Sequence, residues 1–296
     1  MRVFVTGATG WVGLAVVKDL LAAGHQVLGL ARSEERAQAL AAAGASVQLG
    51  SLADLATLSR CAAETDGVIH TAFNHDFSKL AESSEEERRA IETIGGALEG
   101  SDRPFIVTSG VALLAPGRVT TENEPARAPI PSFPRSPEID IAKLVARGLR
   151  VAAVRLAPTV HGLGDHGFVP RVIGFAREKG VSAYVGDGQN RWPAVHRFDA
   201  ARVFRLALEH GAEGGPFHAI TEEGVPFKQI AEVIGRRLNL PVVALSPEEA
   251  AGHFGWFGTF VGIDCPSSSE RTRSSLSWQP EHPTLLADLD QPGYFA

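Results

Sequence analysis

The sequence predicts an α/β protein built on a doubly wound parallel sheet, with a smaller α/β lobe toward the C-terminus. Three observations support this fold class. A glycine-rich turn follows the first apolar segment, short apolar segments then alternate with helical patterns, and this regularity ends after Gly162. Of the 296 residues, 44% are hydrophobic and 21% are charged, which is typical of a chain that buries a large core.

The first strand and helix follow from the N-terminal pattern. Residues 2–5 form a short apolar run typical of a buried strand, and a helical apolar pattern runs from Leu14 to Ala23 before Gly24 ends it. Between them lies the turn Thr6-Gly7-Ala8-Thr9-Gly10-Trp11-Val12-Gly13. A strand, a tight turn and a helix in this order form the unit from which parallel sheets are built.

The same alternation continues through the first half of the chain. Ser33 is placed to cap a helix that runs through the alanines to Gly44. The further expected strands are residues 26–30, 46–49, 67–70, 104–108 and 150–156. Successive strands separated by helices run parallel, because each helix carries the chain back to the same edge of the sheet.

The second half of the chain is less regular. The Pro-rich stretch from Ala115 to Pro137 excludes a regular helix or a central strand and predicts an ordered loop beside the active site. Beyond it we expect helices over residues 169–179, 199–209 and 227–238, the last introduced by Pro226. The expected division is a first domain of residues 1–165 with a returning segment 193–220, and a second lobe of residues 166–192 and 221–296.

Charge and composition exclude several classes of partner. The net charge of −6, without any run of Lys and Arg, predicts no nucleic-acid and no membrane partner. Cys61 and Cys265 are too few for a disulfide framework or a zinc site, so we expect no metal and a reducing compartment. Because the N-terminus lacks signal-peptide features, we expect a cytoplasmic protein that acts on a small-molecule substrate, and a homodimer stays open.

The glycine turn predicts a dinucleotide-binding site. Gly7, Gly10 and Gly13 have the spacing with which a backbone turn approaches a pyrophosphate, and the N–H groups and dipole of the following helix attract that anion. Such spacing alone is weak evidence, since tight turns also use glycine for conformational reasons. Its position between the first strand and the first helix strengthens the prediction.

The end of the second strand indicates which dinucleotide binds. A carboxylate there would bind the ribose hydroxyls of NAD(H), but the sequence has Leu30-Ala31-Arg32-Ser33. The guanidinium of Arg32 would bind a ribose 2′-phosphate that an aspartate would repel, whereas a solvated surface charge is the structural alternative. We therefore expect NADP(H) on the first domain, with NAD(H) as the less favoured cofactor.

At these residues the chain resembles the short-chain dehydrogenase/reductase superfamily, in particular its extended and atypical branch of epimerases, dehydratases and reductases. Besides the Thr-Gly-x-x-Gly-x-x-Gly turn, the markers are residues 69–72, 107–109, 155–162, 186–188, 195–199 and 276–280. The resemblance covers nearly the whole chain and implies a Rossmann-type fold. With the turn and the strand end, it gives these expected cofactor-binding residues: Thr6, Gly7, Thr9, Gly10, Trp11, Val12, Gly13, Arg32, Ser33, Thr71, Ala72, Thr108, Pro158, Thr159 and Val160.

The usual catalytic pair of that superfamily is absent from the sequence. Its members use a Tyr whose phenol is acidified by a Lys four residues later, beside a Ser or Thr. Tyr184 and Tyr294 are the only tyrosines, and neither has a Lys four positions on. Residues 133–137, Phe-Pro-Arg-Ser-Pro, match the motif best but lack both the acid and its partner, and Lys143 lies too close to the next strand to replace them.

Other groups must therefore act on the substrate, or the chemistry differs. Hydride transfer to a carbonyl leaves an alkoxide that needs a proton or strong hydrogen bonds. The expected catalytic candidates are Ser109, Arg135, Ser136 and His161. The residues expected to border the substrate are Asn74, His75, Phe168, Trp192 and His196. A structural role in a core, a turn or a solvated surface is the alternative for each of them.

The first functional hypothesis is an NAD(P)H-dependent oxidoreductase that reduces a small carbonyl or another electrophilic double bond with a nonstandard proton donor. The alternatives are a non-catalytic NADP(H)-binding or redox-sensing module and a nucleotide-sugar epimerase or dehydratase. The sequence has no His-Glu-x-x-His, no Gly-x-Ser-x-Gly and no Gly-Lys-Ser/Thr ending on its glycine turn. It therefore lacks the signatures of zinc peptidases, serine hydrolases and P-loop enzymes.

Overall fold

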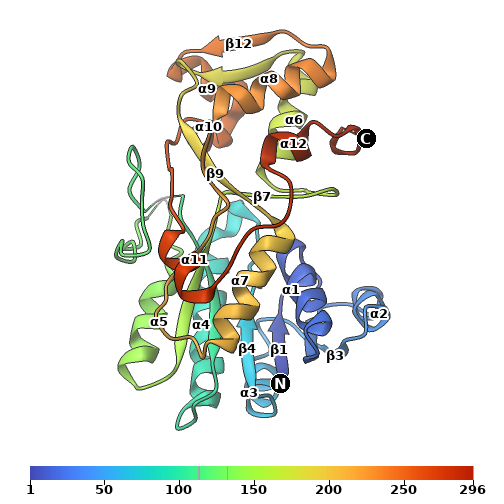
Figure 1. Ribbon diagram of the computed structural model, residues 1–296, viewed down its shortest axis with the longest axis vertical. Coiled ribbons are helices and arrows are strands. Elements are labelled where there is room, and N and C mark those ends of the chain that lie inside the picture. The colour runs from blue at the N-terminus through green and yellow to red at the C-terminus, as the bar shows by residue number, and fades with distance from the viewer. Residues whose placement is uncertain (113, 132, 296) are drawn as a thin grey trace.

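A seven-stranded parallel sheet forms the centre of the larger of two lobes in the computed structural model, which describes residues 1–112, 114–131 and 133–295 (Figure 1). The sheet order is β10-β6-β5-β4-β1-β2-β3. These strands are β1 (Arg2–Thr6), β2 (Gln26–Ala31), β3 (Ser46–Leu49), β4 (Gly67–His70), β5 (Phe105–Gly110), β6 (Val151–Leu156) and β10 (Phe217–Ala219). The order reverses between β1 and β4, and doubly wound sheets bind ligands at this point.

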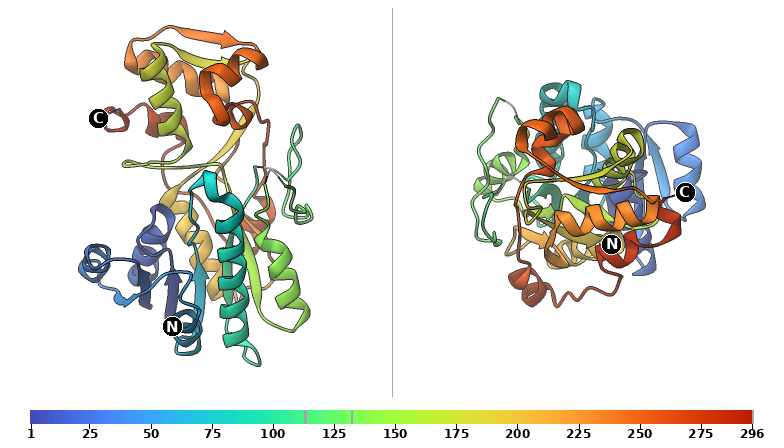
Figure 2. Two further views of the ribbon diagram at one scale, coloured as in Figure 1. Left: turned by 180° about the vertical axis from the view of Figure 1, so that it is seen from behind. Right: turned by 90° about the horizontal axis from the view of Figure 1, so that it is seen from above.

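Different helices cover the two faces of this sheet. One face carries α1 (Trp11–Ala22), α2 (Glu34–Ala42) and α7 (Arg197–Glu209), and the other carries α3 (Leu55–Ala63), α4 (Leu80–Leu98) and α5 (Pro137–Ala146) (Figures 1 and 2). Side chains alternate across the sheet along each strand. Thus Val3 and Val5 belong to one core and Phe4 to the other, and all three are fully buried. The doubly wound α/β fold predicted from the sequence is confirmed.

The second lobe lies beyond the carboxyl edge of the large sheet (Figure 1). It contains a three-stranded sheet of β7 (Thr159–His161), β9 (Arg191–His196) and β11 (Glu222–Pro226), and a pair of β8 (Ser182–Val185) and β12 (Val242–Leu245). Its helices are α6 (Phe168–Lys179), α8 (Phe227–Leu238), α9 (Pro247–Phe254), α10 (Gly258–Val261) and α12 (Leu285–Leu289). Trp192, Phe227, Phe254 and Phe257 are fully buried at the centre of this lobe.

Several element bounds agree with the sequence pattern, and one differs for a clear reason. β3, β4 and α8 have the bounds expected, whereas α1 begins at Trp11 rather than at Leu14. Gly10 is the N-cap of α1, so the last part of the glycine turn already forms the first helical turn. The described part of the Pro-rich stretch forms neither a helix nor a strand before Pro137, which begins α5, and Ser132 within the stretch lies outside the described residues.

The C-terminal part of the chain contacts both lobes. α11 (Glu270–Leu276) and the following Trp278 pack against the larger lobe, where Leu276 and Trp278 join the core between the sheet and α7. The chain then returns to the second lobe through α12 (Figure 1). This course differs from the expected assignment of residues 221–296 to the second lobe alone, because a buried tryptophan anchors the segment on the larger one. Among the described residues, no helix has both the length and the apolar composition needed to span a membrane.

A fully buried carboxylate at the start of α7 holds this returning segment. Asp199 accepts hydrogen bonds from the backbone N–H groups of Glu281 and His282 at 3.0 and 3.1 Å, and the Nδ1 of His282 lies 2.9 Å from the same carboxylate. Buried donors cost free energy when they lose their acceptor. Asp199 therefore joins the C-terminal segment to the junction between the lobes.

We predict that Asp199→Asn destabilises the protein by about 1–3 kcal/mol, because an amide nitrogen replaces one acceptor oxygen and leaves a buried donor unpaired. Urea unfolding measures this difference. Asp102→Asn is the matched control, since the Asp102 side chain is 89% exposed and its loss of charge leaves no buried donor unpaired. Equal unfolding free energies for both variants would contradict this account of the segment.

Candidate active site

A cleft of about 840 Å³ runs along the carboxyl edge of the large sheet and reaches the second lobe. It is lined by the glycine turn, the ends of β2, β4, β5 and β6, the Pro-rich loop, and the N-terminal turn of α6. The carboxyl ends of parallel strands meet at one edge, which is why side chains from distant parts of the sequence converge here. The volume is in the range of small-molecule binding sites.

The glycine turn is closely packed and leaves the first turn of α1 facing the cleft. Gly7 has φ +65°, and a Cβ atom on Gly13 would lie 2.0 Å from the Gly7 carbonyl oxygen. Gly7, Gly10 and Gly13 all line the cleft, and no side chain in the described part of the chain caps α1. The backbone N–H groups at this helix start are therefore available to an anion.

Two guanidinium groups line the cleft, one just after the end of β2 and one in the first turn of α2. Arg32 and Arg36 both border it, and among the described residues neither forms an ion pair with a carboxylate. The Ser33 hydroxyl accepts the backbone N–H of Arg36 at 3.4 Å and caps α2, as the sequence predicted. Ser33 itself does not line the cleft. This end of the cleft thus presents unpaired positive charge and fits a phosphate group.

Threonines fix the ends of the central strands beside the turn. The Thr71 hydroxyl donates to the Thr6 carbonyl at 2.8 Å, and the Thr108 hydroxyl donates to the His70 carbonyl at 2.8 Å. Thr6 is fully buried, and its hydroxyl bonds to the Nδ1 of His70 at 2.8 Å rather than lining the cleft. Burial, followed by the positive charge of Arg135, lowers the pKa of His70 to about 3, which keeps this ring neutral.

Trp11 connects the glycine turn to the second lobe. Its indole N–H donates to the Val160 carbonyl at 2.7 Å, and the Arg197 guanidinium lies 4.1 Å from the ring centroid. The edge of His166 packs on the same indole at 5.6 Å between centroids. Trp11, Val160 and His166 all line the cleft, so this residue fixes one wall of it.

A hydrogen-bonded chain of three side chains lies at the end of β5. The Ser109 hydroxyl donates to Glu138 Oε1 at 2.6 Å, and Arg155 donates to both oxygens of Glu138 at 2.9 and 2.6 Å. Arg155 is 1% exposed. Its Nη1 also faces the His218 ring nitrogen at 3.3 Å. Ser109 and Glu138 line the cleft, so a buried arginine orients a carboxylate and a hydroxyl toward it.

A second buried ion pair lies beside the first. Arg135 donates from Nε and Nη2 to the two oxygens of Glu87 at 2.8 and 2.6 Å, and Nη2 also reaches the Thr108 carbonyl at 3.1 Å. Its guanidinium lies 4.5 Å from the centroid of Phe73. Burial raises the pKa of Glu87, and the charge of Arg135 opposes that rise. Arg135 lines the cleft with its orientation fixed by this pair.

The segment matched to the missing Tyr-Lys motif also borders the cleft. Phe133, Arg135, Ser136 and Pro137 line it, so Phe133 contributes a ring without a hydroxyl. The Ser136 hydroxyl donates to the Arg127 carbonyl at 2.6 Å. Ser136 therefore holds the Pro-rich loop, whereas Ser109 contacts an acid.

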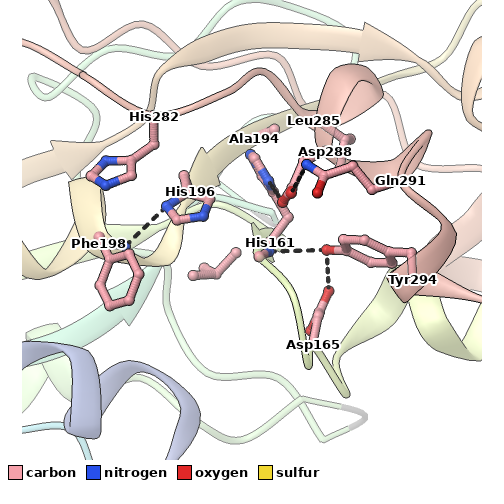
Figure 3. Close-up of polar contacts among 12 residues, drawn as sticks. His161, Asp165, Ala194, His196, Phe198, His282, Leu285, Asp288, Gln291 and Tyr294 are labelled. Atoms are coloured by element: carbon pink, nitrogen blue, oxygen red, sulfur yellow. Dashed lines mark hydrogen bonds and ion pairs between the residues drawn. The ribbon is translucent and has the colours of Figure 1, made fainter. Parts of the chain in front are cut away.

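The structure does not bring His161 or His196 into the cleft. His161 is fully buried, and its Nδ1 lies 2.8 Å from Asp288 Oδ2 (Figure 3). β7 pairs with β9, and the C-terminal α12 supplies Asp288, so His161 joins the core of the second lobe. His196 stacks on His282 at 4.5 Å between centroids. Burial, followed by the charges of His161 and His282, lowers the pKa of His196 to about 4.

Trp192 and Thr159 also lie away from the cleft. Trp192 is 1% exposed, and its ring packs against Phe227 with centroids 4.9 Å apart. Thr159 is 2% exposed on β7. Phe168 lies between the cleft and the core of the second lobe, because it lines the cleft and its ring centroid is 6.0 Å from that of Trp192. Trp192, which was expected to form a wall of the substrate pocket, instead packs in the core of the second lobe.

The other expected site residues do line the cleft. They are Thr9, Val12, Thr71, Ala72, Asn74, His75, Thr108 and Pro158. Sequence reasoning missed Glu87 and Glu138, which orient Arg135 and Ser109, and it missed the cleft-lining Phe73, Asp165, Arg171 and Phe260. Glu138 directly follows Pro137 in the first turn of α5, where an acid also interacts favourably with the helix dipole. Its position in the sequence therefore did not distinguish a functional acid from one that only stabilises the helix.

Comparisons with known proteins agree with this geometry. A family model described as NAD(P)H-binding matches residues 7–129. An uncharacterized protein of Schizosaccharomyces pombe is 50% identical over 100% of both chains. The 4-hydroxy-2-methyl-3-oxo-4-farnesyl-3,4-dihydroquinoline-1-oxide ketoreductase of Stigmatella aurantiaca is 29% identical over 86% of this chain and 80% of its own length.

A solved structure shows the same fold at greater sequence distance. The UDP-glucose 4-epimerase of Thermotoga maritima superposes with a TM-score of 0.72 and 19% identity, over 100% of this chain and 98% of that one. An identity this low supports the fold alone. Together with the glycine turn and the parallel sheet, these findings show that the chain belongs to one family with the Schizosaccharomyces pombe protein, contains an NAD(P)H-binding domain, and has the fold of short-chain dehydrogenase/reductase proteins.

Proposed function

We propose that the protein is an NADPH-dependent reductase of a small carbonyl compound or another electrophilic double bond. One observation carries this proposal. A single cleft contains an uncapped helix start, two unpaired guanidinium groups at the end of β2, and the Ser109–Glu138 pair at the end of β5. The similarity to a protein named as a ketoreductase supports the same reaction class.

The proposed cofactor contacts follow the order of the strand ends. The glycine turn and the start of α1 would hold the pyrophosphate, and Arg32 with Arg36 would hold the 2′-phosphate of NADP(H). Thr71 and Ala72 would border the adenosine side, while Thr108, Pro158 and Val160 would border the nicotinamide. We assign supporting roles to Thr6, Ser33 and Thr159, because they do not line the cleft.

Arg135 is proposed to stabilise the substrate oxygen. When bound, NADPH supplies the hydride, and the carbonyl oxygen then becomes negative. Arg135 lines the cleft, and its Nη1 is not part of the pair with Glu87. A fixed cation in a partly buried site stabilises such a charge without first reorganising. Because an arginine does not give up its proton near neutral pH, this role is electrostatic.

Ser109 is proposed to carry the proton. Its hydroxyl lies 2.6 Å from Glu138 Oε1, and Arg155 fixes that carboxylate. In reduction, the Ser109 hydroxyl would turn from Glu138 to the substrate oxygen, and its Oγ–H bond would break as the proton moves to that oxygen. A water molecule would then return a proton to the serine oxygen through Glu138 and leave hydroxide in the solvent. This route replaces the tyrosine that the sequence lacks. The same missing pair argues against an epimerase or dehydratase.

We predict that Arg32→Ala weakens NADPH binding by about 10-fold to 100-fold, which corresponds to the loss of one hydrogen bond to a charged group. NADH binding should change less than about 3-fold, because NADH has no 2′-phosphate. Fluorescence titration with both dinucleotides measures the two dissociation constants. Arg60→Ala is the control, since Arg60 is an exposed arginine outside the cleft. Equal losses for NADPH and NADH would contradict the assignment of Arg32.

We predict that Ser109→Ala lowers kcat about 100-fold or more, the usual size of a lost proton-transfer group, while the NADPH dissociation constant stays the same. Substrate-dependent loss of NADPH absorbance, across aldehydes, ketones, enones, imines and quinones, measures kcat. Ser136→Ala is the matched comparison, because its hydroxyl contacts only the Arg127 carbonyl. A wild-type protein that binds NADPH tightly but turns over none of these compounds would instead be a non-catalytic binding module.

A further inference from the structure

The charge of the cleft is opposite in sign to the charge of the chain. The net charge of the chain is −6. Of the residues that the structure describes, five arginines line the cleft but only three carboxylic side chains do: Arg32, Arg36, Arg127, Arg135, Arg171, Glu86, Glu138 and Asp165. Clefts lined by one sign of charge raise the local concentration of ligands of the other sign. The phosphates of the proposed cofactor would account for the positive charge of Arg32 and Arg36 at one end of the cleft. The positive charge at the other end needs a separate explanation.

Arg127 and Arg171 provide positive charge at the substrate end. Arg127 lies on the Pro-rich loop and Arg171 on α6, so they reach the cleft from different lobes. Among the described residues neither guanidinium has a carboxylate partner, and each lies near an aromatic ring, Arg127 near Phe133 at 5.9 Å and Arg171 near Trp256 at 5.8 Å to the centroid. Arg135 differs from both because Glu87 neutralises it.

The cleft-lining acid Asp165 accepts hydrogen bonds from neighbouring groups and forms no ion pair with Arg127 or Arg171 among the described residues. Asp165 Oδ1 accepts the Gly167 N–H at 2.7 Å, and the Tyr294 hydroxyl donates to Oδ2 at 3.3 Å (Figure 3). Burial raises the pKa of Asp165, which disfavours its charged form. At His75, desolvation and then the positive charges of Arg135, His166 and Arg171 lower the pKa of the ring. These cations therefore act on the same part of the cleft.

Aromatic rings form the rest of the substrate end. Phe73, Phe133, Phe168 and Phe260 line the cleft, and the Phe168 and Phe260 centroids are 5.4 Å apart. Such walls favour a flat or apolar body. The cleft volume of about 840 Å³ must accommodate the cofactor as well, and one bound ligand commonly uses a site of about 300–1,000 Å³. The space beside the cofactor thus suits a small molecule rather than a second nucleotide.

We propose that the substrate carries a carboxylate on an aromatic or other flat apolar body, with Arg171 as the main carboxylate-binding residue and Arg127 as a second cation that lines the same cleft. The inference rests on the proposed reductase function and specifies its substrate class. A carboxylate can accept two hydrogen bonds from one guanidinium. The hydrogen bonds that an uncharged ester accepts from the same group are weaker. The ring walls would hold the apolar body next to Ser109 and Arg135.

The test compares 4-formylbenzoate with its methyl ester as substrates of the NADPH-loaded protein. The carboxylate should have a kcat/KM about 10-fold to 100-fold above that of the ester, the range expected for a hydrogen bond to a charged group. Arg171→Met should remove most of this preference by lowering the kcat/KM of the carboxylate about 10-fold or more. Arg171→Lys should keep part of it. Lys179→Met is the matched control, because it removes a positive charge from α6 outside the cleft.

A binding experiment separates this inference from the proposed function. Calorimetric titration of 4-(hydroxymethyl)benzoate into the complex with NADP⁺ needs no turnover. Binding that Arg171→Met weakens about 10-fold supports the carboxylate site even if no aldehyde is reduced, in which case only the reductase proposal fails. Reduction of the ester as fast as the carboxylate, or no carboxylate binding, overturns the inference. Tighter binding of UDP-glucose than of the carboxylate overturns it in favour of a nucleotide sugar.

Discussion

The whole architecture depends on the absence of side chains at two positions of the glycine turn. A Cβ atom on Gly7 would lie 2.6 Å from the Ala72 nitrogen, and one on Gly13 would lie 2.0 Å from the Gly7 carbonyl oxygen. This close packing brings the end of β1 against the end of β4, where the Thr71 hydroxyl bonds to the Thr6 carbonyl. The start of α1 consequently faces the cleft, and Trp11 at that point reaches the second lobe. A backbone constraint thus places both the anion site and the junction between the lobes.

Two acids, the buried Glu87 and the half-buried Glu138, determine the orientation of the groups at the centre of the cleft. Glu87 and Glu138 each bind an arginine through both carboxylate oxygens. A buried carboxylate without a partner would be costly, so each pair is restricted to one geometry. In the proposed reaction, this restriction keeps Arg135 and Ser109 in place while the substrate oxygen changes charge.

The fold, and the position of the glycine turn at the carboxyl edge of the sheet, could be predicted from the sequence because local signals specify them. Glycine spacing, strand length and helix capping by Ser33 act over a few residues. The remaining parts depend on contacts between distant segments. His161 looked like a candidate acid from its place after a strand, but Asp288, far along the chain, buries it. Glu87 lies in a run of charged residues, and only the packing of α4 shows that this one acid points inward.

The pattern of charge along the cleft separates binding from chemistry. Arg32 and Arg36 at one end, and Arg127 and Arg171 at the other, have no acidic partner among the described residues, whereas Arg135 between them is paired with a buried acid. Unpaired cations attract ligand anions over a distance, and a paired cation is weaker as an attractor but fixed in position. An anion at each end would therefore place the reacting oxygen beside the fixed group. The missing Tyr-Lys pair is consistent with this arrangement. In the proposed reaction, the Ser109 hydroxyl is a weaker acid than the usual tyrosine, so proton transfer depends more on accurate positioning of the substrate. Binding of an anion at each end of the cleft would supply that positioning.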